Sequence, residues 1–365
     1  MTPAVVSDPR SILVVVTRRL GDVLLATPLV RSVKRAWPET ALDVLVFEGT
    51  QGVIAANPDV RRILTVPERP GWLAHLSFIL GLLRRYDVAL SVLHGDRPTL
   101  YAFLAGHWRA GLLKPTRKEG WKRLLLQRWV PFDDLNTHTV RMHLALAGAL
   151  GVSPSREVVV AWNAEEERAS ARLLGGDTRP LAVLHPYPKF NYKMWRREAW
   201  IEVALWLAGR GFRLALSGGG DADELAYVAS IARTMPPETI NAAGKLSLGA
   251  SACLVSRARI YIGPDTAITH IAAALGVPTV ALYGPTNCVK WGPWPRSHAP
   301  DVNPWRRCGS QRSGNVTLLQ GAGACVPCHL EGCDRHIGSY SDCLQQLPAA
   351  RVIAAIEQLL EAGRA

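Results

Sequence analysis

The chain of 365 residues is about twice the length of a typical single domain, so two domains are expected. Its 48% hydrophobic and 20% charged residues are ordinary for a globular protein and exclude a chain that is largely disordered. A formal net charge of +12 favours an anionic partner, but the basic residues are scattered and carry no zinc-finger, RNP-type or helix-turn-helix signature, which argues against nucleic acid.

Strands and helices alternate in the first part of the chain. Residues 1–10 have no apolar run behind a basic leader, so we expect no secretion signal. Residues 12–16 are an unbroken apolar run rich in β-branched side chains, typical of a strand covered on both faces in a parallel sheet. A helix is predicted over 22–37, where apolar residues recur at close to helical spacing, and strands over 42–47 and 88–93 complete a parallel sheet.

The longest apolar stretch covers residues 72–83 and contains His75. A membrane-spanning helix needs about 20 apolar residues, which this stretch does not reach. We therefore expect no transmembrane helix.

The alternation starts again after a polar segment, residues 151–180, in which a short acidic helix is expected. Strands are predicted over 181–185, 212–217, 260–262 and 278–283. We therefore expect a second Rossmann-like unit, with the domain boundary near residues 158–162.

The last part loses this periodicity over residues 293–343, which collect Gly, Pro and five cysteines, and a helical pattern resumes over 349–360. The expected divisions are an N-terminal domain over 1–160, a C-terminal domain over 161–347 with a cysteine-containing insertion over 296–345, and a closing helix over 348–365.

The first candidate site is the turn between strand and helix over residues 17–28. Gly21 permits close backbone approach, and Asp22 stands at the expected helix start, where a structural N-cap is the alternative to catalysis. The turn follows the carboxyl end of a parallel strand, where open α/β sheets place ligands. The glycine pattern G-x-G-x-x-G is absent here, which argues against a nicotinamide or flavin enzyme.

The second candidate is the segment 262–276, in which a strand ends and a helix begins near Thr266. Free amides and the helix dipole at that end suit a diphosphate, and His270 lies one turn further on the same face. Gly276 then ends the helix. The alternative is an N-capped core helix whose histidine is fully hydrogen-bonded.

Two further loops follow strands of the second unit. Lys189 or Lys193 in the loop 185–195 offers a cation for phosphate, and the glycine turn 217–224 brings acidic side chains that suit ribose hydroxyls. Each loop alone is better explained as a solvated surface turn. Together with the helix start near Thr266 they outline a nucleotide-sugar site.

These motifs resemble glycosyltransferase family 9, the bacterial lipopolysaccharide heptosyltransferases. The resemblance covers nearly the whole chain and rests on four segments in the family's order and spacing, residues 19–28, 193–195, 263–270 and 283–286. The arrangement around Lys193, 221–224 and 291–294 looks most like the heptosyltransferase III branch.

The resemblance implies an α/β fold of GT-B type, with two Rossmann-like domains whose parallel sheets face a central cleft. The N-terminal domain would bind the acceptor and the C-terminal domain the nucleotide sugar. It further implies inverting, metal-independent and cofactor-free transfer from ADP-L-glycero-β-D-manno-heptose to the lipopolysaccharide inner core. Asp22 would be the general base, and Lys193 would neutralise diphosphate charge as ADP leaves.

By the same resemblance Asp265 would hold donor-sugar hydroxyls, Asp223 would bind the ribose, and Leu246 would lie beside the adenine. The residues expected to bind the donor are Asp265, Thr266, Ala267, His270, Asp223, Leu246, Gly218 and Gly219. The sequence departs from the family pattern in two places. Residues 187–189 replace hydroxyl residues that some relatives use for phosphate, and Ala267 replaces a glycine, which could narrow the donor pocket.

The implied acceptor is a phosphorylated lipid sugar at the inner membrane. We therefore expect a monomeric cytoplasmic protein that associates peripherally with the cytoplasmic face of that membrane. Arg18 and Arg19 are candidates for acceptor binding, with a solvated surface as the alternative. Further basic candidates are Lys114, Arg117, Lys118, Lys122 and Arg123.

Cys325, Cys328, Cys333 and Cys343 are separated by two, four and nine residues. The first pair has zinc-ligand spacing, but the set matches no standard finger. Free thiols in a reducing cytosol are expected, and a structural zinc or iron–sulfur site is the alternative.

Three other functions compete with this interpretation. A family 9 transferase could use another nucleotide sugar, and a non-catalytic protein that binds nucleotide sugars or polyanions would keep the second-unit loops without depending on Asp22. An epimerase or dehydrogenase-like enzyme is disfavoured by the missing glycine fingerprint.

Overall fold

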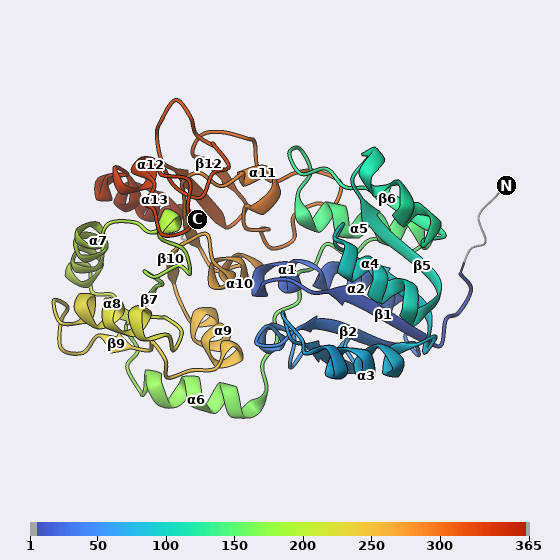
Figure 1. Ribbon diagram of the computed structural model, residues 1–365. Coiled ribbons are helices and arrows are strands. Elements are labelled where there is room, and N and C mark those ends of the chain that lie inside the picture. The colour runs from blue at the N-terminus through green and yellow to red at the C-terminus, as the bar shows by residue number, and fades with distance from the viewer. Residues whose placement is uncertain (1–5, 363–365) are drawn as a thin grey trace. The chain divides into compact units, whose positions relative to one another are not determined.

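The computed structural model describes residues 6–362, which form two compact units (Figure 1). The first unit contains the chain through Ala161 together with Ala299–Asn303, and the second contains Trp162–His298 and the chain from Pro304 onward. The segment 1–10, for which we expect no secretion signal, lies partly outside the described residues. Within residues 6–362, no helix combines the length and the hydropathy needed to cross a bilayer.

The first unit is built on a six-stranded parallel sheet in the order β3-β2-β1-β4-β5-β6. Its strands are β1 Ser11–Val16, β2 Ala41–Phe47, β3 Arg62–Val66, β4 Tyr86–Ser91, β5 Gly106–Leu113 and β6 Arg128–Pro131. The strand order reverses between β1 and β4, and open α/β sheets bind ligands at the carboxyl ends of the strands at such a point. Residues 12–16 are fully buried, as predicted for a strand covered on both faces.

The helices of this unit are α1 Leu20–Leu25, α2 Thr27–Ala36, α3 Trp72–Leu82, α4 Asp96–Ala105 and α5 Thr139–Ala149, with 3₁₀ turns η1 Gln51–Val53 and η2 Arg117–Leu124. The single helix predicted over 22–37 is wrong, because the chain breaks at Ala26 into α1 and α2. Pro28 lies in the first turn of α2, where its missing N–H is tolerated, and the Thr27 hydroxyl donates to Leu24 O at 2.7 Å.

A buried carboxylate links β2 to β4 and to the residue that precedes β3. Asp43 in β2 is fully buried and receives two hydrogen bonds from Arg61, at 2.9 and 2.7 Å. The hydroxyl of Tyr86 donates to it at 2.8 Å, and burial together with this carboxylate raises the pKa of Tyr86. The charge of Asp43 is therefore paired and hydrogen-bonded inside the protein.

The second unit has a seven-stranded sheet in the order β12-β13-β11-β10-β7-β8-β9. Its strands are β7 Leu181–Leu184, β8 Arg213–Leu216, β9 Ile240–Asn241, β10 Ile260–Pro264, β11 Thr279–Tyr283, β12 Gln311–Ser313 and β13 Val316–Gln320. Strand β12 pairs antiparallel with β13, and the other described neighbours pair in parallel. Its helices are α6 Ala164–Leu174, η3 Asn191–Lys193, α7 Arg197–Gly209, α8 Ala222–Ala232, α9 Leu248–Ser256, α10 Ala267–Leu275, α11 Cys288–Trp291, α12 Asp342–Gln345 and α13 Ala349–Ala362.

The region 293–343, expected to lack regular structure, supplies two strands of this sheet. Strand β13 is buried along its whole length and extends the parallel sheet beside β11. Only three of its five residues, Val316, Leu318 and Leu319, are apolar, and this pattern is too short to stand out in a segment rich in glycine and cysteine. The core of the unit is formed by Trp195 and Trp200 with one face of α13, where Val352 and Ile356 are fully buried.

The segment Ala299–Asn303 belongs to the first unit although it lies far along the chain. Asn303 Oδ1 accepts hydrogen bonds from the His138 amide and from Arg141 Nη1, both at 3.1 Å. Asn303 Nδ2 donates to Asn136 O at 2.6 Å. The pattern of hydrophobic residues along the sequence does not indicate that Ala299–Asn303 belongs to the first unit.

Candidate active site

The loops that follow parallel strands of the second sheet meet at one edge. His185, after β7, lies with Nδ1 3.0 Å from the hydroxyl of Ser217, which follows β8. The amide of Gly244, after β9, donates to Gly218 O at 3.1 Å. The sheet therefore brings together the loops that the sequence marks as donor-binding.

Asp265 is the centre of this edge and lies directly after β10. Lys193 Nζ is 2.6 Å from Asp265 Oδ2, and the Thr286 hydroxyl donates to the same oxygen at 3.1 Å. The Tyr283 hydroxyl donates to Asp265 Oδ1 at 3.3 Å. Burial alone would raise the pKa of Asp265, but the Lys193 ammonium, His270 and these hydrogen bonds outweigh it and lower the pKa. Asp265 is therefore an ionised carboxylate at neutral pH.

The predicted Lys193 and Asp265 thus form a direct ion pair, with Tyr283 and Thr286 as additional partners. Sequence reasoning missed these two partners as site residues. The segment 283–286, which is part of the family resemblance, could have identified both residues, because Tyr283 and Thr286 are its first and last residues.

His270 lies beside this ion pair, with Nε2 3.9 Å from Asp265 Oδ1. Burial lowers the pKa of His270 to about 4, against the opposing effect of Asp265, so the imidazole is neutral at pH 7. Its Nδ1 is buried and has no hydrogen-bond partner within residues 6–362. The alternative of a fully hydrogen-bonded core histidine is therefore wrong, because Nδ1 is left without a partner among the described residues.

The start of α10 has the form expected of an anion-binding helix end. Thr266 occupies the N-cap position, yet in the described structure its side chain makes no capping hydrogen bond. Its hydroxyl lies 3.3 Å from that of Thr269, which donates to Pro264 O at 2.5 Å. Ala267 is the first helical residue, and Gly276 ends the helix with φ of 80°. A side-chain cap does not compete for the amides of this turn, which favours binding of a phosphate.

The glycine turn after β8 is held by Glu224, one of the acidic residues that the sequence places in this turn as candidates for ribose hydroxyls. Glu224 Oε1 accepts from the Gly219 amide at 2.6 Å, and burial raises the pKa of this carboxyl. An added Cβ on Gly218 would stand 3.0 Å from the same oxygen, so a larger residue there would displace the Glu224 carboxylate. Asp221 Oδ1 caps α8 by accepting from the Asp223 amide at 3.0 Å.

The side chain of Asp223 is exposed beside this turn, where a ribose hydroxyl could reach it. Leu246 is half-buried in the loop after β9, which the Gly244–Gly218 hydrogen bond fastens to the turn. Their predicted roles toward ribose and adenine stay predictions.

In the first unit Asp22 lies in the first turn of α1 and is buried. The N-cap position is Arg19, so the alternative of Asp22 as an N-cap is wrong. Arg18 Nε is 3.5 Å from Asp22 Oδ1, and both Arg18 and Arg19 are exposed. A buried carboxylate at the carboxyl end of β1 has the placement expected of a general base.

A second ionic cluster lies after β4, at the same edge of the first sheet. Lys122 Nζ is 2.6 Å from Asp96 Oδ1 and 3.6 Å from Glu119 Oε1, and donates to His94 O at 2.6 Å. Its side chain is only 3% exposed, so the alternative of a solvated surface is wrong for Lys122. Burial, with the Lys114 charge, lowers the pKa of His94. Lys122 and His94 are 28 residues apart in the sequence, so no local sequence pattern predicts their contact.

The four clustered cysteines are free thiols in the structure. Burial, followed by the neighbouring thiols, raises the pKa of Cys343 to about 11. The Asp342 amide donates to Cys333 Sγ at 3.4 Å. Among the described residues, no group of three or more His, Cys, Asp or Glu side chains is placed to hold a metal ion.

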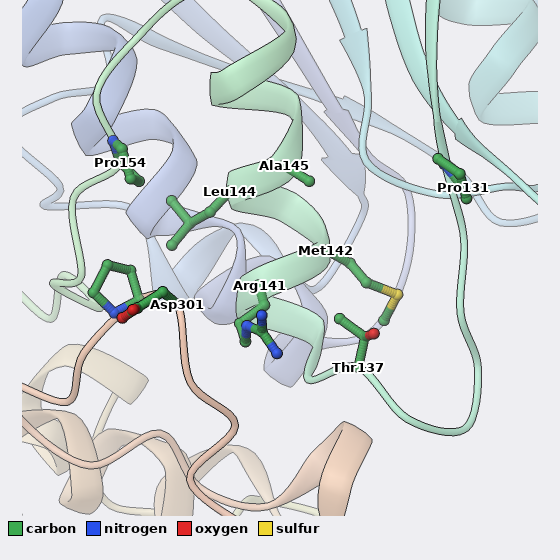
Figure 2. A pocket seen from close by; sticks show the side chains of 9 residues that line it. Pro131, Thr137, Arg141, Met142, Leu144, Ala145, Pro154 and Asp301 are labelled. Atoms are coloured by element: carbon green, nitrogen blue, oxygen red, sulfur yellow. The ribbon is translucent and has the colours of Figure 1, made fainter.

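A cavity of about 290 Å³ opens in the first unit, and none of the residues predicted for the site lines it. Arg141, Leu144 and Ala145 reach it from α5, and Pro154 and Asp301 reach it from two other segments (Figure 2). The cavity depends on the returning segment Ala299–Asn303 for part of its wall.

Comparison with known proteins identifies the family. The family model described as glycosyltransferase family 9 (heptosyltransferase) matches residues 79–310, more than half of the chain. Lipopolysaccharide heptosyltransferase 3 of Escherichia coli (strain K12) is 27% identical over 287 residues, which cover 75% of this chain and 82% of that protein.

Solved structures show the same fold. The family 9 glycosyl transferase from Veillonella parvula DSM 2008 superimposes with a TM-score of 0.76 at 21% identity, covering 97% of each chain. The ADP-heptose lipopolysaccharide heptosyltransferase II of E. coli gives a TM-score of 0.73 at 20% identity, covering 97% of this chain and all of that chain. The chain therefore belongs to glycosyltransferase family 9 and has a GT-B type fold of two Rossmann-like units.

Proposed function

We propose that the protein transfers heptose from ADP-L-glycero-β-D-manno-heptose to the inner core of lipopolysaccharide, with inversion and without a metal ion. The observation that carries this proposal is the Lys193–Asp265 ion pair beside the uncapped start of α10. A cation and helix amides suit a diphosphate, and a carboxylate suits sugar hydroxyls. The names of the relatives, lipopolysaccharide heptosyltransferases, support the choice of donor and acceptor.

The reaction would begin with the exchange of partners at Asp265. The donor diphosphate draws the Lys193 ammonium away, and the freed carboxylate oxygens accept hydrogen bonds from the heptose hydroxyls. The amides at the start of α10 share the phosphate charge, and Nδ1 of neutral His270 offers a further contact. Lys193 thereby takes the place that a divalent cation has in other nucleotide-sugar enzymes.

Asp22 would accept the proton of the acceptor hydroxyl as its oxygen attacks the anomeric carbon. The bond from that carbon to the diphosphate oxygen breaks, and ADP leaves with its developing charge held by Lys193 and α10. Attack from the face opposite the leaving group gives inversion. A positioned general base accounts for about 10²–10⁴ of the rate.

Donor profiling tests the proposal. The purified protein is incubated with ADP-heptose or other nucleotide sugars, with truncated lipopolysaccharide as acceptor and EDTA in parallel samples. We expect product, detected as one added heptose by mass spectrometry, from ADP-heptose with and without EDTA. A stronger reaction with another nucleotide sugar would instead support a different family 9 transferase, an alternative left open by Ala267 in place of glycine.

We further propose that the enzyme works in the cytoplasm as a monomer, at the cytoplasmic face of the inner membrane. The exposed Arg18 and Arg19 support an acceptor that carries phosphate. Buried Lys122 is withdrawn from the basic candidates, because its charge is already paired. Association that does not weaken at high salt would oppose a purely electrostatic attachment.

A further inference from the structure

Helix α3 is apolar except for His75 and Ser77, yet the first unit covers only one side of it. Phe78, Ile79 and Leu82 pack against the core formed with Tyr101. His75 Nε2 lies 2.8 Å from the Tyr101 hydroxyl, which fixes the rotation of the helix. An all-apolar helix is normally buried, so the opposite face calls for a partner.

The uncovered face carries large side chains at helical spacing. The exposed fractions are 75% for Trp72, 62% for Leu73, 49% for Leu76, 63% for Leu80 and 50% for Leu83. Residues 70–83 contain no Asp, Glu, Lys or Arg. Figure 1 shows α3 on the outside of the first unit. Contiguous apolar patches of this kind on soluble proteins mark interaction sites.

Positive charge borders both ends of this face. Exposed Arg69 precedes the helix, and exposed Arg84 and Arg85 follow it, against one acid, Glu68. Arg84 Nη1 donates to Gly106 O at 2.6 Å, which holds that guanidinium at the end of the helix. An apolar face between cations complements a surface that is apolar beneath a layer of phosphates.

We propose that α3 is the segment by which the protein lies on an anionic phospholipid bilayer. The apolar face enters the boundary between headgroups and acyl chains, Trp72 sits at headgroup level, and the exposed Arg69 and Arg85 meet lipid phosphates. Eleven residues extend about 16 Å, roughly half of the hydrocarbon thickness, so the helix lies in the plane of the interface. This inference rests on the proposed function in one respect: an acceptor that is carried by lipid requires the enzyme to act at a membrane surface.

The charges around the exposed face of α3 also argue against a second copy of the chain as the partner that covers it. A two-fold pairing of α3 with itself, parallel or antiparallel, places the arginines of one copy against those of the other. The face offers no carboxylate within residues 70–83, and the single Glu68 at its start does not balance Arg69, Arg84 and Arg85. Like charges at such a contact oppose association, whereas lipid phosphates satisfy them.

The test is co-sedimentation with phosphatidylcholine vesicles and with vesicles containing 30% phosphatidylglycerol. The test variant is Leu76→Gln/Leu80→Gln, and the matched control is Leu205→Gln/Ile337→Gln, which changes two exposed apolar residues of the second unit. We expect the wild type and the control to bind the anionic vesicles and the test variant to bind at least about tenfold more weakly. Arg69→Gln/Arg85→Gln should lower the preference for anionic lipid by about fivefold per arginine.

The proposal is overturned if the wild type does not bind anionic vesicles, or if the test variant binds as well as the control. It is also overturned if light scattering shows a dimer that the test variant converts to monomer while vesicle binding persists. Unchanged thermal unfolding excludes misfolding of the variant. Heptose transfer to a delipidated, soluble acceptor is measured in parallel for the wild type, the control and the variants. If none of them transfers heptose, the proposed function is refuted, but the role of α3 in membrane binding is not decided by that result.

Discussion

Replacing Lys193 by Met removes the positive charge from the Asp265 ion pair while keeping the length of the side chain. The ammonium is 2.6 Å from a carboxylate that is 8% exposed, and the lysine side chain itself is 19% exposed. Removing one partner of such a pair leaves a buried charge without compensation, which costs about 3–5 kcal/mol. The same change removes the cation that faces the leaving diphosphate, a loss of about 10²–10³ in kcat.

The pH dependence of stability has a definite sign. In the wild type the pKa of Asp265 is depressed, so its contribution is present above the unfolded pKa of about 3.9 and is lost as pH falls through the folded value. Without Lys193, burial dominates and raises that pKa, so the folded variant gains stability as pH falls. The stability difference between wild type and Lys193→Met should therefore be larger at pH 8 than at pH 5.

Urea unfolding at pH 5 and pH 8 and steady-state kinetics with ADP-heptose measure both effects. Lys189→Met is the matched control, because this exposed lysine lies in the same loop. The double variant Lys193→Met/Asp265→Asn should recover part of the stability but none of the activity. Equal effects of Lys193→Met and Lys189→Met on both stability and kcat would refute the reasoning.

Three further changes test other parts of the site and fold. Asp22→Asn should lower kcat by about 10²–10⁴ while calorimetry shows unchanged ADP affinity, and undiminished turnover would remove Asp22 as the base. His270→Phe should weaken ADP-heptose binding by about fivefold to tenfold because Nδ1 is lost. In an NMR titration of the wild type, the His270 imidazole should stay neutral down to about pH 5, and protonation of His270 at pH 7 would contradict this reasoning. Asp43→Ala should cost about 2–4 kcal/mol in urea unfolding, because Tyr86 and Arg61 lose their common partner, and a change within 0.5 kcal/mol would show that solvent replaces it.

The fold was predictable where the local pattern and the tertiary structure agree. Residues 12–16 were identified as a covered strand because an unbroken β-branched run suits a central parallel position. The break at Ala26 was missed because apolar spacing continues through it, and only Pro28 marks the new start. Strand β13 was missed because its neighbours in sequence have the composition of a loop.

The candidate site was predictable where it depends on loops that follow parallel strands. Asp265 and Lys193 were selected separately, but their contact depends on pairing between β7 and β10, which are distant in sequence. Glu224 was included in the acidic turn, but its hydrogen bond to the Gly219 amide was not predicted, because that contact depends on side-chain geometry. The burial of Lys122 was not foreseen, since a lysine in a basic segment looks solvated until its acidic partners fold around it.

The return of Ala299–Asn303 to the first unit limits how the protein can be divided or recombined. The chain passes from one unit to the other after Ala161, after His298 and after Asn303, so a fragment that stops at Ala161 would lack Asn303. The amide of His138 and the guanidinium of Arg141 would then lose their shared acceptor. A chimera that exchanges donor specificity between relatives consequently needs three junctions, with this short piece kept from the parent that supplies α5.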